Sequence, residues 1–349
     1  RYPPWPGPAG GHTAAAVRAA TRPLRVRAQG ARGAPWQGLG VGRLVIPEDP
    51  TVDMLLSVLF ALGAAFSNAL ATVLQRKGAL GVPRSDKLRA GLMLDLLRRP
   101  VWLAGIVAMI TAAVCQAVAL ATGPLTVVQP LFVLELPLTL AIATVVLRAR
   151  LSRTGWAAAF AVVAGLAVAL TAASPEGNRT QVPMDRWIPA LAVCAGVIVC
   201  LVLAALRRPE GRARAACFGL ATAVAYAMTA ALMKTSVRTL DDSGVTAFLT
   251  TWQTYGFALF GASALFLLEN AMQAGPLVAS QPAITLGDAS VSLALGITVY
   301  SESVRTGWWL LPQLLGVALI VAGVLMLSRL PLARSLTGED RSTVNAEAP

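Results

Sequence analysis

The chain has 349 residues, of which 56% are hydrophobic and only 13% are charged, and its formal net charge is +12. Soluble domains carry about a quarter charged residues, so this composition excludes an ordinary water-soluble protein. The positive charge would suit nucleic-acid binding. Most basic residues, however, lie in short segments beside apolar runs, where membrane topology explains them, so we expect no nucleic-acid partner.

Residues 1–53 differ in composition from the rest of the chain, with seven Arg, no Lys and many Pro, Gly and Ala. The first methionine is Met54, where the first apolar run begins. We therefore expect residues 1–53 to be a disordered extension or a translated upstream region, with a transit peptide as the alternative. Residues 330–349 are polar and predict a disordered cytoplasmic tail.

Nine apolar runs follow, each long enough for a bilayer core, which takes roughly 20 residues. Their length favours helices over the alternating strands of a membrane barrel. They predict an all-α polytopic membrane protein with about nine transmembrane helices, at Met54–Gln75, Val101–Thr122, Pro124–Leu147, Thr154–Ala173, Ile188–Leu206, Ala215–Met233, Phe248–Leu268, Leu277–Tyr300 and Gly307–Ser328.

A block of thirty-four residues, 123–156, recurs without a gap 152 positions later, at 275–308. Ten paired positions are identical, and both copies contain Gly-Pro-Leu, Gln-Pro and Arg-Thr-Gly-Trp. Such a repeat in a hydrophobic chain is typical of transporters built from two related halves. We therefore expect a first repeat of four helices (54–173), a linker with a fifth helix (174–214) and a second repeat of four helices (215–329).

The loops beside the runs carry basic residues unevenly. With the N-terminus outside, seventeen Lys and Arg after residue 53 fall on the inner side and five on the outer side. Because Lys and Arg accumulate in cytoplasmic loops, the N-terminus is predicted outside and the C-terminus inside. The two copies of the block then lie five spans apart, which inverts the second relative to the first. If the run 188–206 does not cross, the repeats become parallel instead.

Two runs contain one acidic residue each. Glu135 lies eleven residues after Pro124, and Asp288 lies twelve residues after Pro276. At about 1.5 Å per helical residue, both are near the middle of a ~30 Å core. A buried carboxyl group that favours its neutral form suits proton coupling, whereas two close carboxylates can hold a cation. The alternative is a protonated carboxyl group that only hydrogen-bonds between helices.

The Gln-Pro pairs are the next candidates, at Gln129-Pro130 and Gln281-Pro282. Proline removes a backbone donor and can break a helix beside the polar side chain, and broken helices supply ligands in many transporters. We expect helix breaks at Pro130 and Pro282, with an ordinary kink as the alternative.

Other polar side chains in the runs are candidates to line a pathway. They are equally suited to interhelical hydrogen bonds, or in the case of Glu269 to reaching the membrane surface. This set consists of Asn68, Gln116, Glu269 and Asn270.

The two Arg-Thr-Gly-Trp copies are read as interfacial anchors. Arg153 and Trp156 in the first copy, and Arg305 and Trp308 in the second, have side chains suited to lipid headgroups. The threonine of each copy is expected to cap the helix that follows.

The residues needed for several other functions are absent from the apolar runs. The single histidine, His12, lies outside them. We expect no enzyme activity and no cofactor, because no recognisable nucleophile and base pair occurs. The four cysteines lie in or at the ends of runs, which argues against a disulfide framework. The 26 Arg and 3 Lys suggest a GC-rich bacterial genome and hence a bacterial cytoplasmic membrane.

The motifs together resemble the drug/metabolite transporter superfamily, with inverted repeats of the EamA-like type, and within it the NIPA-like magnesium-transporter branch. The resemblance covers about residues 54–329. It rests on Leu74-Gln75-Arg76-Lys77-Gly78, on Ala119-Leu120-Ala121-Thr122-Gly123-Pro124 and on Thr126-Val127-Val128-Gln129-Pro130.

The resemblance implies a carrier that works by alternating access. The sequence also departs from that branch, because Ala113 and Gln116 stand where an acid and an Asn are usual, and Arg148 to Arg150 replace an acid that the second repeat keeps as Glu302. We therefore expect a carrier of a small solute, coupled to protons. The first alternative is a permease for magnesium or another divalent cation, with metal ligands unknown, and the second is a membrane scaffold without transport. A homodimer is left open.

Overall fold

The computed structural model describes residues 50–80, 99–148, 150–177, 182–275 and 277–330. All of them belong to one compact unit of the chain, Ile46–Pro349. The polar tail expected at 330–349 lies outside the described residues except for its first position. The extension expected at 1–53 lies outside them except for its last four positions, and these form part of the first helix.

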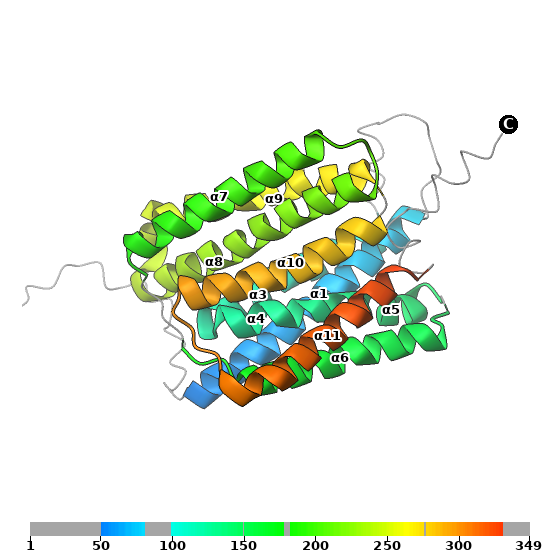
Figure 1. The fold of residues 1–349 in the computed structure, drawn as a ribbon, viewed down its shortest axis with the longest axis horizontal. Coiled ribbons are helices and arrows are strands. Elements are labelled where there is room, and N and C mark those ends of the chain that lie inside the picture. Colours follow the sequence, from blue (N-terminus) through cyan, green and yellow to red (C-terminus); the bar gives the residue numbers. More distant parts are fainter. Residues whose placement is uncertain (1–49, 81–98, 149, 178–181, 276, 331–349) are drawn as a thin grey trace, which may run out of the picture. The chain divides into compact units, whose positions relative to one another are not determined.

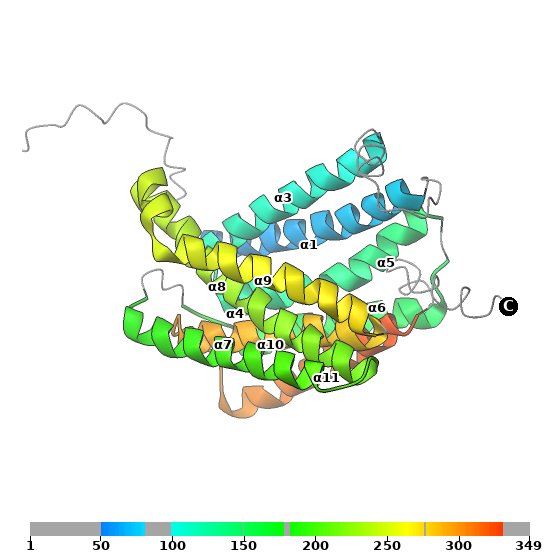
Figure 2. The same ribbon diagram turned by 90° about the horizontal axis from the view of Figure 1, so that it is seen from above.

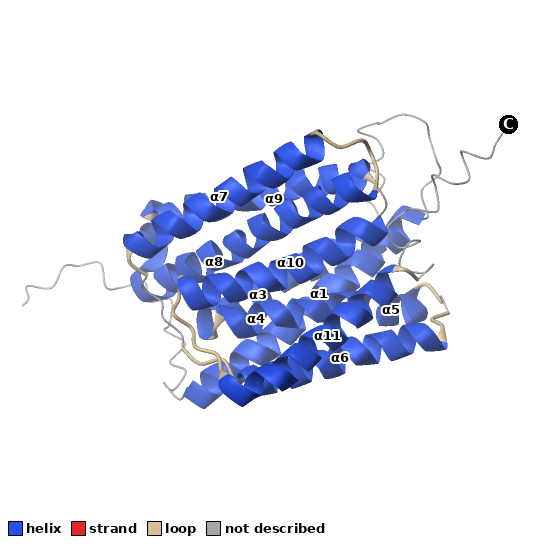
Figure 3. Ribbon diagram, in the orientation of Figure 1, coloured by secondary structure: helices blue, strands red, loops and turns tan. Residues whose placement is uncertain are grey.

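The described part of the chain is almost wholly helical and contains no strand (Figure 3). Two single turns of 3-10 helix accompany the α-helices, one between α4 and α5 and the other just before α11 (Figure 1). In chain order the elements are α1 (Pro50–Leu80), α3 (Pro100–Thr122), α4 (Leu125–Leu131), η1 (Phe132–Leu134), α5 (Glu135–Val146), α6 (Arg153–Ala173), α7 (Met184–Leu206), α8 (Arg212–Thr250), α9 (Trp252–Ala274), α10 (Leu277–Thr298), η2 (Gly307–Trp309) and α11 (Leu310–Ser328).

Within the described residues, eight helical segments are long and apolar enough to cross a membrane. One of them, 125–146, combines α4, η1 and α5. α10 is less apolar, but it lies along α8 and runs opposite to α11 (Figure 1). The prediction of an all-α membrane protein with about nine transmembrane helices is therefore confirmed. The helix α7, on which the inversion of the repeats depends, is among the eight.

α6 and α11 are counterparts in the two repeats, and they pack side by side in opposite directions. The backbone N–H of Arg305, just before α11, donates to the carbonyl of Ala173 at the end of α6 at 2.9 Å. At the other end, Leu330 lies beside Gly155 at the start of α6. The helices that carry the two copies of the repeated block thus run antiparallel, as the expected inversion of the second repeat requires.

Small residues allow α6 and α11 to approach closely. A Cβ atom on Gly316 would lie 2.6 Å from the carbonyl oxygen of Gly165, and a Cβ atom on Gly323 would lie 2.8 Å from that of Ala158. Glycine at such positions lets helix backbones touch, which is a common way of joining helices in lipid. The glycines of this seam therefore join the two halves of the protein.

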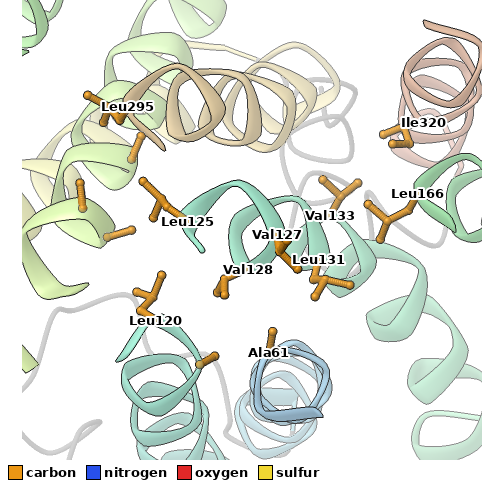
Figure 4. Packing of buried hydrophobic residues seen from close by; sticks show 14 of the residues in the cluster. Ala61, Leu120, Leu125, Val127, Val128, Leu131, Val133, Leu166, Leu295 and Ile320 are labelled. Carbon is orange, nitrogen blue, oxygen red and sulfur yellow. The ribbon is translucent and has the colours of Figure 1, made fainter. Parts of the chain in front are cut away.

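The largest hydrophobic cluster is centred on α4, where Leu125, Val127, Val128 and Leu131 are all buried (Figure 4). Ala61 of α1, Leu120 of α3, Leu166 of α6 and Leu295 of α10 belong to the same cluster. α1 and α3 form one helical pair and α8 and α9 another (Figure 2). The short helix α4 thus lies where elements of both repeats meet.

Several helix boundaries differ from the sequence expectation, and the differences at α1 and α8 are the most informative. α1 begins at Pro50, four residues before Met54. α8 continues to Thr250 where a loop was expected after Met233, and its only non-helical residue is Gly244, with φ 79°. The apolar run ended at Lys234 because that residue is charged, but helix formation does not require apolar residues, and Lys234 is buried within the helix.

Candidate functional site

The two intramembrane carboxyl groups lie in different halves of the protein. Glu135 is the first residue of α5, directly after the turn η1, and Asp288 lies in the middle of α10. Both side chains are partly buried. Asp288 is close enough to Glu135 to feel its charge. The structure thus brings the pair together from the two repeats.

Polar groups from three helices surround the pair. The side chain of Asn68 on α1 lies within hydrogen-bonding reach of the Glu135 carboxyl group. The hydroxyl of Ser292, one turn after Asp288, donates to Asp288 Oδ1 at 3.3 Å. Tyr226 of α8 is close enough to both carboxyl groups to feel their charges. We call Asn68, Glu135, Tyr226, Asp288 and Ser292 the central cluster.

The chemistry of the central cluster is dominated by oxygen. Among the described residues, the groups that act on the two carboxyls are Asn68, Ser292 and the carboxyls themselves, and none of these is basic. Carboxylate, amide and hydroxyl oxygens are the ligands that hard divalent cations prefer. The described ranges contain no group of three or more His, Cys, Asp or Glu that could form a closed metal cage.

The other predicted pathway residues differ in burial, and none of them belongs to the central cluster. Gln129 is buried in α4, and its Nε2 atom has no hydrogen-bond partner among the described residues, while Gln281 of α10 and Gln116 of α3 are partly buried. Glu269 of α9 is exposed. Asn270 donates to the Phe266 carbonyl of its own helix at 2.7 Å. The structure therefore does not bring the α9 pair into the central cluster.

The two Gln-Pro pairs have different outcomes. At the first, α4 ends at Leu131, one residue after Pro130, and the turn η1 leads directly to Glu135. At the second, α10 continues through Pro282 to Thr298, so the expected helix break at Pro282 is wrong. A proline removes only one N–H, and a helix can absorb that loss when its neighbours hold it.

The two Arg-Thr-Gly-Trp copies lie at the ends of helices. Trp156 and Trp308 are 52% and 86% exposed, and the Arg305 guanidinium lies 5.3 Å from the Trp309 ring. The expected threonine caps are wrong. Ser152 caps α6 by accepting from the Gly155 N–H, and Thr306 makes no capping bond before η2.

The sequence reasoning missed a buried ion pair. Lys234 Nζ of α8 lies 2.9 Å from Glu302 Oε1, and neither side chain is exposed. The same ammonium group donates to the Gly123 carbonyl at 3.0 Å. The apolar pattern places Lys234 in a loop, and the sequence singles out Glu302 only through the family resemblance. Their partnership spans 68 positions, and no local pattern marks it.

The Glu302 carboxylate also accepts two backbone hydrogen bonds. The N–H of Leu125 donates to Oε1 at 2.7 Å and that of Thr126 to Oε2 at 2.8 Å. Glu302 reaches them because Gly296 has no side chain, since a Cβ atom there would lie 2.6 Å from Glu302 Oε2. The carboxylate thus satisfies the free N–H groups that follow the break at Gly123-Pro124.

Comparison with known proteins agrees with this architecture. The family model described as "Magnesium transporter NIPA" matches residues 52–239. An uncharacterized protein of Corynebacterium glutamicum is 33% identical over 285 residues, which cover 81% of this chain and 96% of that protein. No solved structure matches the chain.

The matched region includes α1 to α7 and the α8 segment that carries Tyr226 and Lys234. The similarity to the Corynebacterium protein extends over most of the chain. Together with the multi-span fold, these matches support a membrane transporter. The chain belongs to the NIPA family of magnesium transporters, within the drug/metabolite transporter superfamily.

Proposed function

We propose that this protein is a permease for a divalent cation, with Mg²⁺ as its cargo, and that Glu135 and Asp288 bind the cation midway across the membrane. The observation that carries the proposal is the meeting of two carboxyl groups with neutral polar side chains, and with no basic group acting on them among the described residues. An excess of negative charge in a membrane interior is costly unless a cation or protons neutralise it.

The modest number of protein ligands suits magnesium in transit. Mg²⁺ gives up its water reluctantly and is usually held by one or two carboxylates with several waters retained. Glu135 and Asp288 supply the charge, and the oxygens of Asn68, Tyr226 and Ser292 are available to the ion or to its waters. A closed cage would hold the ion too tightly to release it.

The inverted halves supply a mechanism for release on either side. Each half contributes one carboxyl group, from α5 and from α10. Rocking of one half against the other would expose the shared site to each side in turn, as in other carriers with inverted repeats. We place the protein in the bacterial cytoplasmic membrane, with its N-terminus outside and its C-terminus in the cytoplasm.

Transport by purified protein in liposomes tests this function. A magnesium-sensitive dye inside the liposomes should report uptake by the wild type, and Glu135→Gln and Asp288→Asn should each reduce it by about tenfold or more, because second-shell changes alone cost 10–100-fold at metal sites. Glu269→Gln removes an exposed carboxyl on α9 and should transport normally.

A second dye that reports protons separates the remaining alternative. If the wild type moves no Mg²⁺ but carries a proton flux with a small solute, and both variants abolish that flux, the proton-coupled carrier replaces the present proposal. If Glu135→Gln and Asp288→Asn each take up Mg²⁺ at the wild-type rate, the central cluster does not have the proposed role.

A further inference from the structure

A second group of charged residues lies away from the central cluster, at the end of the bundle where α3 ends and α4 begins. We call it the Gly123 end. There, Lys234 from α8 bonds to the Gly123 carbonyl and to Glu302, while Glu302 accepts from the first two N–H groups of α4. One ion pair therefore joins segments of both repeats.

This end of the protein is densely closed in the structure. Tyr300 and Trp187 are 0% exposed, as is Lys234. The Lys234 ammonium lies 4.7 Å from the Tyr300 ring centroid. The Trp187 ring meets Tyr300 edge-on at 6.0 Å and Trp252 at 5.6 Å. Lys234, Trp187 and Tyr300 are all withdrawn from water, so an ion leaving the central cluster by this route would have to move them.

The equivalent point in the second repeat is held differently. Gly275, the counterpart of Gly123, packs on the backbone of Gly211, whose N–H donates to the Ala274 carbonyl at 2.8 Å. The counterpart of Glu302, 152 positions earlier, is Arg150, which cannot accept a hydrogen bond. The position equivalent to Glu302 therefore cannot fasten the Gly275 end with a carboxylate as Glu302 fastens the Gly123 end.

We propose that the ion pair of Lys234 and Glu302 is the lock that keeps the Gly123 end closed, and that the two side chains separate when this end opens during transport. Each is a positioning residue that acts through the helix break at Gly123-Pro124. The inference rests on the alternating-access part of the proposed function and does not depend on which cargo is carried.

The chemistry of a buried pair predicts the direction of the effect. Removing one partner leaves an uncompensated charge in the closed end, which is strongly unfavourable, whereas removing both partners leaves none. Opening would return a lone charge to water. Single neutral variants should therefore favour the open state most strongly. The double neutral variant leaves no lone charge but also no ion pair, so it should open more readily than the parent and less readily than the single variants.

The lock can be tested without any cargo. Ser57 is 0% exposed and lies against Gly123, so Ser57→Cys, in a background with Cys115, Cys194, Cys200 and Cys217 replaced, reports opening of this end. The measurement is its rate of labelling by a membrane-impermeant maleimide, added to intact cells and to inside-out vesicles. Lys234→Met and Glu302→Gln should each raise the rate about tenfold or more, from one side of the membrane only.

Two double variants test the geometry of the lock. Lys234→Met with Glu302→Gln should label faster than the parent, because the ion pair is gone, but more slowly than the single variants, because no lone charge is left. The exchange variant, Lys234→Glu with Glu302→Lys, keeps both charges but should label as fast as the single variants. Its ammonium group would face the N–H donors of Leu125 and Thr126, and its carboxylate would face the Gly123 carbonyl.

Three results would overturn the proposal. Monodisperse single variants could label at the parent rate, the double neutral variant could label at the parent rate, or the exchange variant could stay closed. If the single variants do not fold, Gly296→Ala gives a further test. Its added methyl group displaces the Glu302 carboxylate, while both charged residues, Lys234 and Glu302, are retained. If Gly296→Ala then labels at the parent rate, the lock is again refuted. The labelling rates do not depend on magnesium transport. A failure of the lock can therefore be told apart from a failure of the proposed Mg²⁺ cargo.

Discussion

The side chain of Ser57 occupies the space that a side chain on Gly123 would need, so α1 and the end of α3 are in direct contact. The Ser57 hydroxyl also donates to the Ala119 carbonyl at 3.1 Å. This contact explains why the first Gly-Pro-Leu motif begins with glycine. At Gly275 the neighbour is the backbone of Gly211 instead, so the two copies keep the same residue for different local reasons.

Gly123→Ala should lower stability, because the added methyl group overlaps Ser57 in a closely packed region. Overpacking of this kind costs about 1–3 kcal/mol. Thermal unfolding in detergent measures the effect. Gly196→Ala is the matched control, since a Cβ atom at Gly196 meets nothing within 4 Å. Equal melting temperatures for the two variants would contradict the contact.

The seam between α6 and α11 makes a similar prediction. A Cβ atom on Gly316 would lie 2.6 Å from the Ala169 nitrogen and from the Gly165 oxygen, both of which are backbone atoms. Gly316→Ala should therefore push the halves apart and lower stability by about 1–3 kcal/mol. At Gly261 the nearest atom, Thr229 Cγ2, would be 3.6 Å away, so Gly261→Ala should unfold at the wild-type temperature. If Gly316→Ala also unfolds at the wild-type temperature, α6 and α11 are not closely packed at Gly316.

Asn68→Asp should change affinity and turnover in opposite directions. It adds a third carboxylate beside Glu135, and a higher ligand charge tightens cation binding. We expect the KM for Mg²⁺ to fall by about tenfold and the maximal rate to fall as release slows. Uptake into liposomes over a range of Mg²⁺ concentrations measures both. The control is Asn270→Asp on α9, which should leave KM unchanged. An unchanged KM for Asn68→Asp would place that residue outside the binding site.

The membrane orientation is also open to test. The charge bias of the loops predicts that Gly177, between α6 and α7, is outside and that Leu330, after α11, is inside. Alkaline phosphatase is active only outside the bacterial cytoplasm, so a fusion after Gly177 should be active and one after Leu330 inactive. The opposite pattern of activities would reverse the assigned orientation.

Sequence alone predicted the features that depend on composition and on the repeat. The spans follow from apolar runs, and the inversion follows from an odd number of crossings between Trp156 and its counterpart Trp308. The location of Glu135 and Asp288 near the membrane midplane stays a prediction, made by counting residues along helices. These inferences need only local composition and chain order.

The remaining features depend on contacts that local patterns do not encode. The same Gln-Pro dipeptide precedes a helix end at Pro130 and lies within a continuous helix at Pro282. Lys234 follows an apolar run, and this pattern predicts a loop residue, although Lys234 pairs with Glu302 inside the bundle. Moving Lys234 from the outer loops leaves four basic residues there, which strengthens the orientation argument.

The limited hydropathy of α10 bears on how the protein is made. Among the long helices in the described ranges, α10 does not reach the apolarity expected of an independent span, because it carries Gln281, Asp288 and Ser292. Such a segment enters lipid poorly by itself. α8, against which α10 packs, is synthesised first and offers it a protein surface. Insertion of α10 is thus expected to depend on a partner already in the bilayer, so that the order of synthesis becomes part of the folding route.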